Sequence, residues 1–183
     1  MRRSNAITFW AVVATITGVD VATKWWAETG LAPLRFPHPV AGEWLRLTLV
    51  YNPGAAFGLN VGEYSRWVFM GLTLIALGIL GRLYLNTREG DFPRTVALGL
   101  VVAGALGNLI DRVRSERGVV DFIDIGFGAT RWPTFNVADM AVSSGAVLLA
   151  WVLWYQDQQE TAAGLARAEG GGRPVPAKHG ELS

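Results

Sequence analysis

The sequence predicts an all-α membrane protein with four transmembrane helices. Hydrophobic residues make up 51% of its 183 residues, whereas charged residues make up only 17%. The hydrophobic residues gather in four blocks, each close to the ~20 residues that a helix needs to cross the hydrocarbon core. Polar segments rich in Gly and Pro separate the first block from the second and the third from the fourth. The predicted spans cover about residues 6–26, 67–85, 95–113 and 137–155.

Composition excludes several kinds of chemistry. The chain has no cysteine, so it has no disulfide, thiol nucleophile or thiolate metal site. Its only histidines are His38, which lies between two prolines in a predicted loop, and His179, which lies in a polar tail. A typical zinc site is therefore not expected, and we expect neither a metal nor a cofactor. The net charge of +1 and the lack of a basic cluster with interleaved aromatic residues argue against nucleic-acid binding.

The first block carries a charged pair inside an apolar run. Asp20 and Lys24 are four residues apart, so they share a helix face and can neutralise each other. The pair is either a structural ion pair at a helix end or a brace for a nearby active site, and the local pattern does not separate the two. A basic start before an apolar run also resembles a cleaved signal peptide. The length of the run and the helical spacing of its polar residues favour a membrane span.

Residues 28–64 are too polar to span a membrane, and they contain a predicted strand. Residues 45–51 alternate between apolar and other side chains, which is the period of a strand with one apolar face. The strand ends at the turn signal Asn52-Pro53-Gly54. The small residues of 55–58 would allow close backbone approach, or they form an ordinary hairpin corner.

The third block shows a helix-packing pattern and a polar end. Gly99, Ala103 and Gly107 recur every four residues, the spacing that lets helices pack closely in lipid. At its end, four residues fall close together on a helical wheel. Taken alone they favour interfacial anchors over site residues. They are Gly104, Asn108, Asp111 and Arg112.

We expect two parts in the chain: residues 1–156 as the membrane domain and 157–183 as a disordered polar tail. Four spans place both termini on one side. We expect that side to be the cytoplasm, with 28–64 and 115–134 outside. The positive-inside rule supports this orientation weakly, because 112–131 also holds four arginines.

Three acids mark the candidate chemistry: Asp121 and Asp124 on a strand-like segment at 119–125, and Asp139 at the start of the fourth block. Charged groups at the edge of hydrocarbon are costly and indicate function. Two carboxylates that meet there can share a proton and activate water. The sequence also offers a purely structural role for Asp139, because it follows a good N-cap, Asn136, by three residues, as in a capping box.

Four motifs, in this order, closely resemble the lipoprotein signal peptidase family, also called signal peptidase II. The resemblance covers about residues 6–155. The motifs are Asp20-x-x-x-Lys24, Asn52-x-Gly54-Ala55-Ala56-Phe57, Gly104-Ala105-x-Gly107-Asn108-x-x-Asp111-Arg112, and Val119-Val120-Asp121-Phe122 with Phe135-Asn136-x-Ala138-Asp139.

The resemblance implies a multi-pass aspartyl endopeptidase of the bacterial inner membrane, with a small extracytoplasmic β-sheet that cradles its substrate. Such enzymes cut prolipoproteins just before a cysteine that carries diacylglyceryl. They use no metal and are inhibited by globomycin. We expect a monomer whose partners are these substrates and membrane lipid.

By motif position, the catalytic pair is Asp121 and Asp139, and the place directly after Val-Val selects Asp121 over Asp124. Other matched positions line or support the site. The lining residues are Asn52, Gly54, Asn108, Arg112 and Asn136, and the supporting residues are Asp20, Lys24 and Asp111.

Two other classes of protein compete with this prediction. A channel or transporter would spread its acids through the depth of the bilayer, whereas these acids cluster towards one face. A structural membrane subunit would explain the spans but not the clustering of Asn, Arg and Asp at one depth.

Overall fold

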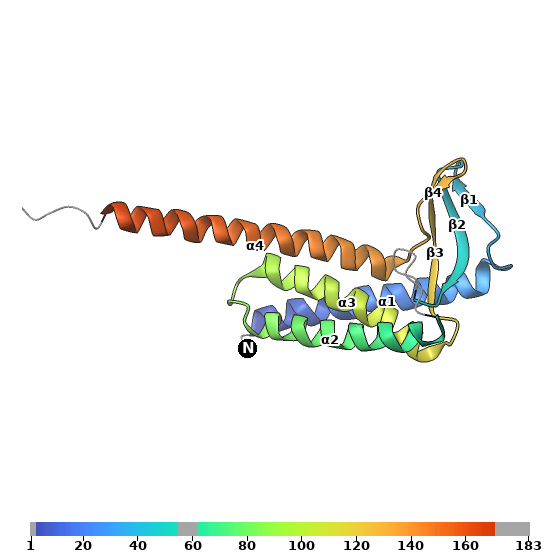
Figure 1. The fold of residues 1–183 in the computed structure, drawn as a ribbon, viewed down its shortest axis with the longest axis horizontal. Coiled ribbons are helices and arrows are strands. Elements are labelled where there is room, and N and C mark those ends of the chain that lie inside the picture. Colours follow the sequence, from blue (N-terminus) through green and yellow to red (C-terminus); the bar gives the residue numbers. More distant parts are fainter. Residues whose placement is uncertain (1–2, 55–61, 171–183) are drawn as a thin grey trace, which may run out of the picture. The chain divides into compact units, whose positions relative to one another are not determined.

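Four long helices dominate the structure, which is a computed structural model that describes residues 3–54 and 62–170. All four are long and apolar enough to cross a membrane, as predicted. A single-turn 3-10 helix, η1 (Gly62–Tyr64), precedes the second of them. The helices are α1 (Arg3–Gly30), α2 (Ser65–Leu85), α3 (Phe92–Arg114) and α4 (Val137–Gly170) (Figure 1).

A four-stranded antiparallel sheet stands at the end of α1–α3 where α1 ends and α2 begins (Figure 1). Its two central strands come from the two polar segments, 28–64 and 115–134. They pair with each other so that Val50 lies opposite Asp121. Both segments therefore lie on the same side of the membrane, as the four-span topology requires. The strands, in order across the sheet, are β1 (His38–Ala41), β2 (Leu45–Asn52), β3 (Val119–Phe127) and β4 (Thr130–Arg131).

Close helix packing follows the predicted small-residue pattern of α3. Ala103 is completely buried. A Cβ added to Gly99 would lie 3.1 Å from the side chain of Val12 in α1. A Cβ on Gly107 would collide with the carboxylate of Asp20 and approach Ala138. Without a strong hydrophobic driving force in lipid, such close packing is a main source of helix association.

At the opposite end of the helices, Asn5 fixes the turn between α2 and α3. Its amide nitrogen donates to the carbonyl of Arg88 at 2.9 Å, and its oxygen accepts from the backbone N–H of Gly90 at 3.2 Å. Nearby, the rings of Phe9 and Tyr84 stack with centroids 3.9 Å apart.

The strand and tail predictions need three corrections. His38 lies in β1 rather than in a loop, because Pro39 is tolerated in an edge strand, where no partner needs its missing N–H. β4 was missed because its two residues carry no periodic pattern. The disorder predicted from residue 157 is not found over 157–170, since α4 continues to Gly170. Residues 156–170 are rich in the strong helix formers Gln, Glu, Ala and Leu and contain no proline.

The structure divides into two compact units, residues 1–149 and 150–183. The first contains the sheet, α1–α3 and the beginning of α4. The second, where described, is the continuation of α4, in which Trp151 and Tyr155 stack with ring centroids 6.0 Å apart. Predictions for residues 55–58 and 171–183 lie outside the described residues.

Candidate active site

Asp121 projects from β3 into a nearly closed polar site. Its carboxylate is 3% exposed and accepts two amide hydrogen bonds, one on each oxygen. Asn136 Nδ2 donates to Oδ1 at 2.7 Å, and Asn52 Nδ2 donates to Oδ2 at 3.1 Å. The second donor is itself oriented, because Asn52 Oδ1 accepts the backbone N–H of Gly54 at 3.0 Å. The turn after β2 therefore aims an amide at the acid on β3.

Gly54 is required by geometry at this turn. Its φ of 125° lies in the region that favours glycine, and an added Cβ would lie 2.5 Å from the ring of Phe69. The predicted lining residue Gly54 thus acts through its backbone on Asn52, and no contact between Gly54 and either candidate acid is seen.

Asp139 lies in the first turn of α4 and has two sets of partners. Its Oδ2 accepts the backbone N–H of Asn136 at 3.2 Å, and its own N–H donates to Asn136 Oδ1 at 2.9 Å. This is the reciprocal arrangement of a capping box. Its other oxygen, Oδ1, accepts Asn108 Nδ2 at 2.8 Å. The structural role predicted for Asp139 is therefore real, and it leaves the carboxylate within the same polar cluster as Asp121.

Asn136 joins the two acids. It is completely buried; its amide nitrogen donates to Asp121 while its amide oxygen accepts from the N–H of Asp139. Both ends of one rigid amide are thus used, so the two acids are held in a fixed relation. The structure brings Asp121 and Asp139 close enough, from β3 and α4, to interact electrostatically.

Two donors orient the Asn108 amide: Lys24, and Asn136, whose Nδ2 donates to Asn108 Oδ1 at 3.2 Å. The ammonium is 1% exposed and donates to Asn108 Oδ1 at 2.9 Å. Because the oxygen faces Lys24, the nitrogen of the same amide faces Asp139. Lys24 also lies 2.8 Å from Asp20 Oδ2 and 3.0 Å from Asp111 Oδ2. The buried ammonium therefore has one hydrogen-bonded amide oxygen and two carboxylates around it, which offset the cost of its burial.

The two acids that pair with Lys24, Asp20 and Asp111, also accept backbone hydrogen bonds from α4 and β3, which carry Asp139 and Asp121. Asp20 Oδ1 accepts the N–H of Ala138, next to Asp139, at 2.8 Å. Asp111 Oδ2 accepts the N–H of Val120, next to Asp121, at 3.1 Å. Of the two interpretations left open for the Asp20–Lys24 pair, the brace for a polar site fits these contacts.

Arg112 is a second cation beside the two acids. It is close enough to Asp139 and Asp121 to interact electrostatically with both, and its guanidinium lies 5.5 Å from the centre of the Phe69 ring. The guanidinium also donates to the carbonyl of Asn108 at 3.3 Å. These contacts of Asn108 and Arg112 fit a role in the site better than the interfacial-anchor interpretation that the isolated pattern favoured.

Asp124 belongs to a different cluster. Arg131 Nε donates to its Oδ1 at 2.8 Å, and the Thr48 hydroxyl donates to Oδ2 at 3.1 Å. Residues three apart in a strand point to opposite faces, which separates Asp124 from Asp121. Sequence reasoning missed Arg131 and Thr48 as its partners, because neither lies at a local spacing that indicates the contact.

Electrostatics favour one proton on the acid pair. Burial, together with the nearby negative charge of Asp139, raises the pKa of Asp121 from 3.8 to about 7. The amide donors Asn52 and Asn136 oppose the shift but do not cancel it. A carboxyl group with this pKa is partly protonated near neutral pH, whereas an ordinary aspartate is not.

A small apolar pocket adjoins Asp139. Its volume is about 260 Å³. The sequence analysis did not predict it, although Phe135 and Met140 flank the N-cap at the spacing of a hydrophobic staple, a signal that places them together. The pocket is lined by Ile125, Trp132, Phe135, Asp139, Met140 and Ser143.

In the part of the chain that the structure describes, no group of three or more His, Asp or Glu side chains is arranged to hold a metal ion.

Comparisons with known proteins identify the family of the chain. The family model for signal peptidase (SPase) II matches residues 12–155. A lipoprotein signal peptidase of Hydrogenovibrio crunogenus is 43% identical over 152 residues, which cover 80% of this chain and 84% of that protein. A lipoprotein signal peptidase of Mycobacterium avium is 41% identical over 145 residues, which cover 76% and 74% of the two chains.

A solved structure of a bacterial membrane enzyme superposes with a TM-score of 0.74 at 31% identity, covering 83% of this chain and 90% of that chain. The chain therefore belongs to the signal peptidase II family. It is a multi-pass bacterial membrane peptidase of the aspartic type, and it removes signal peptides from prolipoproteins. The family prediction made from the four motifs is confirmed.

Proposed function

We propose that Asp121 and Asp139 form the catalytic pair that hydrolyses the peptide bond. The observation that carries the proposal is the Asn136 side chain, which bonds the carboxylate of Asp121 at one end and the backbone of Asp139 at the other. One ionised and one protonated carboxyl beside a shared water are the groups that aspartyl hydrolysis needs.

The hydrogen bonds support one assignment of the proton. Asp139 lies in the first turn of α4, and its carboxylate accepts hydrogen bonds from Asn108 Nδ2 and from the backbone N–H of Asn136. Asp121 is more deeply buried, and its pKa is raised to about 7. In this proposal Asp139 removes a proton from water as the water attacks the scissile carbonyl, and Asp121 donates its proton to the carbonyl oxygen.

The direction of the Asp121 proton follows from its neighbours. Both amide groups that contact this carboxyl present nitrogen, which donates, so neither accepts a proton from Asp121. In this proposal the acidic proton points away from Asn52 and Asn136, towards the bound water and substrate, and Asp121 acts as a hydrogen-bond donor to the substrate.

We also propose that cleavage falls just before a diacylglyceryl-modified cysteine. In this proposal Asn52, Asn108, Arg112 and Asn136 border the bound peptide, and Gly54 positions Asn52. Asp20, Lys24 and Asp111 hold the carrying elements in place. Globomycin would inhibit by occupying the same site, and the enzyme would act as a monomer. The support comes from the family resemblance and from the contacts around the two acids.

The proposed orientation places both termini in the cytoplasm and the sheet outside, in a cytoplasmic (inner) membrane. The arginines near the sheet do not argue against it, because their charges are matched. Arg114 lies 2.5 Å from Glu28, Arg117 lies 3.8 Å from the same carboxylate, and Arg131 pairs with Asp124. We retain residues 1–156 as the proposed peptidase domain and 157–183 as a cytoplasmic extension.

Two experiments test these proposals. Purified protein should convert a diacylglyceryl-modified precursor to signal peptide and mature lipoprotein, and globomycin should block the conversion; an absence of cleavage would refute the activity. Because the chain has no cysteine, single cysteines at Glu43, Glu89 and Glu160 report topology directly. An impermeant thiol reagent should label only Glu43→Cys in intact cells. Labelling of Glu89→Cys without Glu43→Cys would reverse the orientation.

A further inference from the structure

The apolar pocket beside Asp139 has walls that are fixed in place by backbone hydrogen bonds. The N–H of Trp132 donates to the carbonyl of Ile125 at 2.9 Å, which ties one wall to β3. Phe135 exchanges backbone hydrogen bonds with Ile123, at 3.0 and 2.8 Å, which ties the next segment to the same strand. The backbone that carries Trp132 and Phe135 is therefore held against β3.

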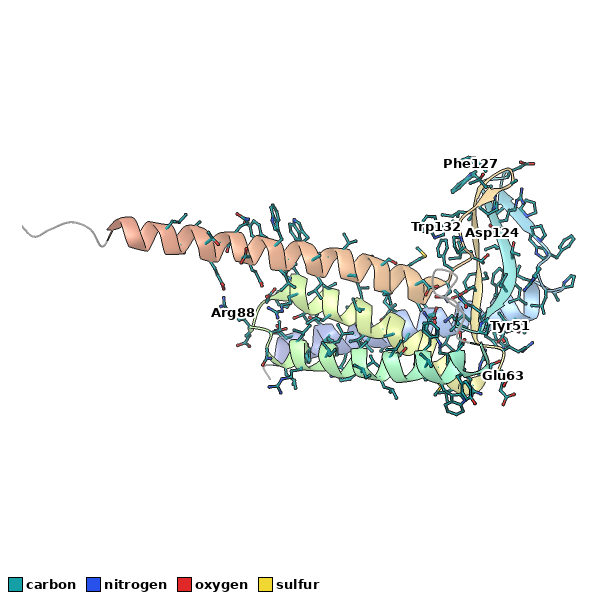
Figure 2. All side chains as sticks on the ribbon, in the orientation of Figure 1. Tyr51, Glu63, Arg88, Asp124, Phe127 and Trp132 are labelled. Atoms are coloured by element: carbon teal, nitrogen blue, oxygen red, sulfur yellow. The ribbon has the colours of Figure 1, made fainter. Side chains whose placement is uncertain are left out.

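The pocket opens towards hydrocarbon. Met140 is 51% exposed and Ser143 is exposed, and both belong to a helix that spans the membrane. The exposed face of such a helix lies in lipid. On the sheet side, Trp132 is 64% exposed and follows β4, near the start of α4 (Figure 2). Trp at this position is typical of the membrane–water interface.

Size limits the occupant. A volume of about 260 Å³ lies just below the range of roughly 300–1,000 Å³ that holds whole drug-sized ligands. The pocket is therefore too small for two acyl chains, but it accommodates the beginning of one. Apart from Asp139 and Ser143, its lining side chains are apolar and offer no charge for a headgroup.

We propose that this pocket holds the first carbons of one acyl chain of the lipidated cysteine. The inference rests on the proposed function, because cleavage just before that cysteine brings its diacylglyceryl group next to the scissile bond and so next to Asp139. Met140, Ser143 and Trp132 are then the residues that determine specificity for the shape of the chain.

The pocket contributes orientation more than hydrophobic binding energy. An acyl chain in a bilayer already lies in hydrocarbon, so little is gained by moving it into another apolar space. Holding its first carbons fixes the direction in which the cysteine backbone approaches the two acids. Such positioning changes the rate of the chemical step, because reacting groups must be held within a narrow geometry.

A chain-shape experiment tests the proposal. Two precursors would be prepared that differ only in their acyl chains, straight in one and methyl-branched beside the ester carbonyl in the other. An extra methyl group in a fitted pocket is discriminated by about tenfold or more, so the unmodified enzyme should show a kcat/KM at least that much lower for the branched precursor. Met140→Ala enlarges the pocket and should reduce the difference to about threefold or less. Met70→Ala, the same change on α2, should leave it unchanged.

The opposite change fills the pocket. Ser143→Phe should lower kcat/KM for the straight-chain precursor by about tenfold or more, whereas Ser144→Phe, on the neighbouring exposed position, should not. Because Met140→Ala is expected to gain activity on the branched precursor, misfolding cannot imitate the result. The acyl assignment would be overturned if Met140→Ala kept the preference of the unmodified enzyme. It would also be overturned if that variant instead tolerated a larger residue before the cysteine, which would identify a peptide side chain as the occupant.

Asp139→Asn separates this inference from the proposed function. If Asp139→Asn is folded and cleaves the straight-chain precursor, the catalytic pair is wrong whatever the acyl preference. If it is inactive while Met140→Ala shows no altered preference, only the pocket assignment fails.

Discussion

Replacing Lys24 by methionine removes one charge and leaves two buried carboxylates, those of Asp20 and Asp111, without their nearest cation. Asp20 is completely buried and Asp111 is 2% exposed, and both lie within 3.0 Å of the Lys24 ammonium. Breaking a buried ion pair from one side typically costs about 3–5 kcal/mol, because the remaining charge has lost both water and its partner. We therefore expect Lys24→Met to lower the free energy of unfolding by about 3–5 kcal/mol.

A matched control lies in the same cluster. Arg114 is 45% exposed and contacts Glu28 and, at 3.9 Å, Asp111. Exposed ion pairs contribute about 0–1 kcal/mol, so Arg114→Met should destabilise by no more than that. A triple variant that combines Lys24→Met with Asp20→Asn and Asp111→Asn should regain much of the stability lost in Lys24→Met, since no unpaired charge is then buried.

Unfolding in mixed detergent micelles can be followed by the fluorescence of the eight tryptophans. The reasoning would be refuted if Lys24→Met and Arg114→Met were equally stable. Activity gives a second measurement: any Lys24→Met that remains folded should cleave more slowly, because the Asn108 amide then loses the shorter of the two hydrogen bonds to its oxygen, which turn its nitrogen towards Asp139.

The remaining predictions concern pH, helix packing and metals. Activity should fall about tenfold per unit above pH 7, since Asp121, with a pKa of about 7, loses the proton that it donates, and a flat kcat/KM profile to pH 9 would contradict this. The same shift should reduce stability as pH rises from 3.8 to about 7, because the folded protein holds this proton more tightly than the unfolded chain, and thermal melts across that range would show it. Gly104→Ala should lower the free energy of unfolding by about 1–3 kcal/mol, because its Cβ would collide with the carbonyl of Ala138 and lie 2.7 Å from the Val142 side chain. Its control is Gly78→Ala, whose Cβ would have no neighbour within 4 Å and which should be neutral or stabilising in the same melt. Cleavage should survive strong chelation, and loss with EDTA that zinc restores would contradict the aspartyl mechanism.

Hydropathy predicted the four spans well because hydrocarbon imposes a simple requirement on each helix by itself. The strand at β2 was predicted for a similar reason, since alternation is a local property. The prediction failed where local patterns are weak: Pro39 concealed β1, and the polar residues after Tyr155 concealed the continuation of α4. Helix formers in a polar segment are compatible with either a helix or a disordered tail.

The site was partly predictable from spacing alone. Asp121 and Asp124 lie three apart in a strand, and alternation already indicates that only one of them faces a given site. The family motifs then selected Asp121. The contact between Lys24 and Asn108, 84 residues apart, has no local signal. The same holds for the Asn136 side chain, whose role as an N-cap was predicted but whose second contact with Asp121 depends on how β3 packs against α4.

The most direct test of the catalytic pair is cleavage of one diacylglyceryl precursor by purified Asp121→Asn, Asp139→Asn, the double variant and Asp124→Asn, each with a thermal melt in detergent. Asp121→Asn and Asp139→Asn should each lose activity by at least about 10³-fold, and the double variant should be no worse, because groups that act as one unit are strongly non-additive. Asp124→Asn should keep substantial activity. If Asp139 served only as a capping residue, its replacement would cost about 1 kcal/mol of stability and spare turnover. An active Asp139→Asn enzyme, or a folded but inactive Asp124→Asn beside an active Asp121→Asn, would contradict the account.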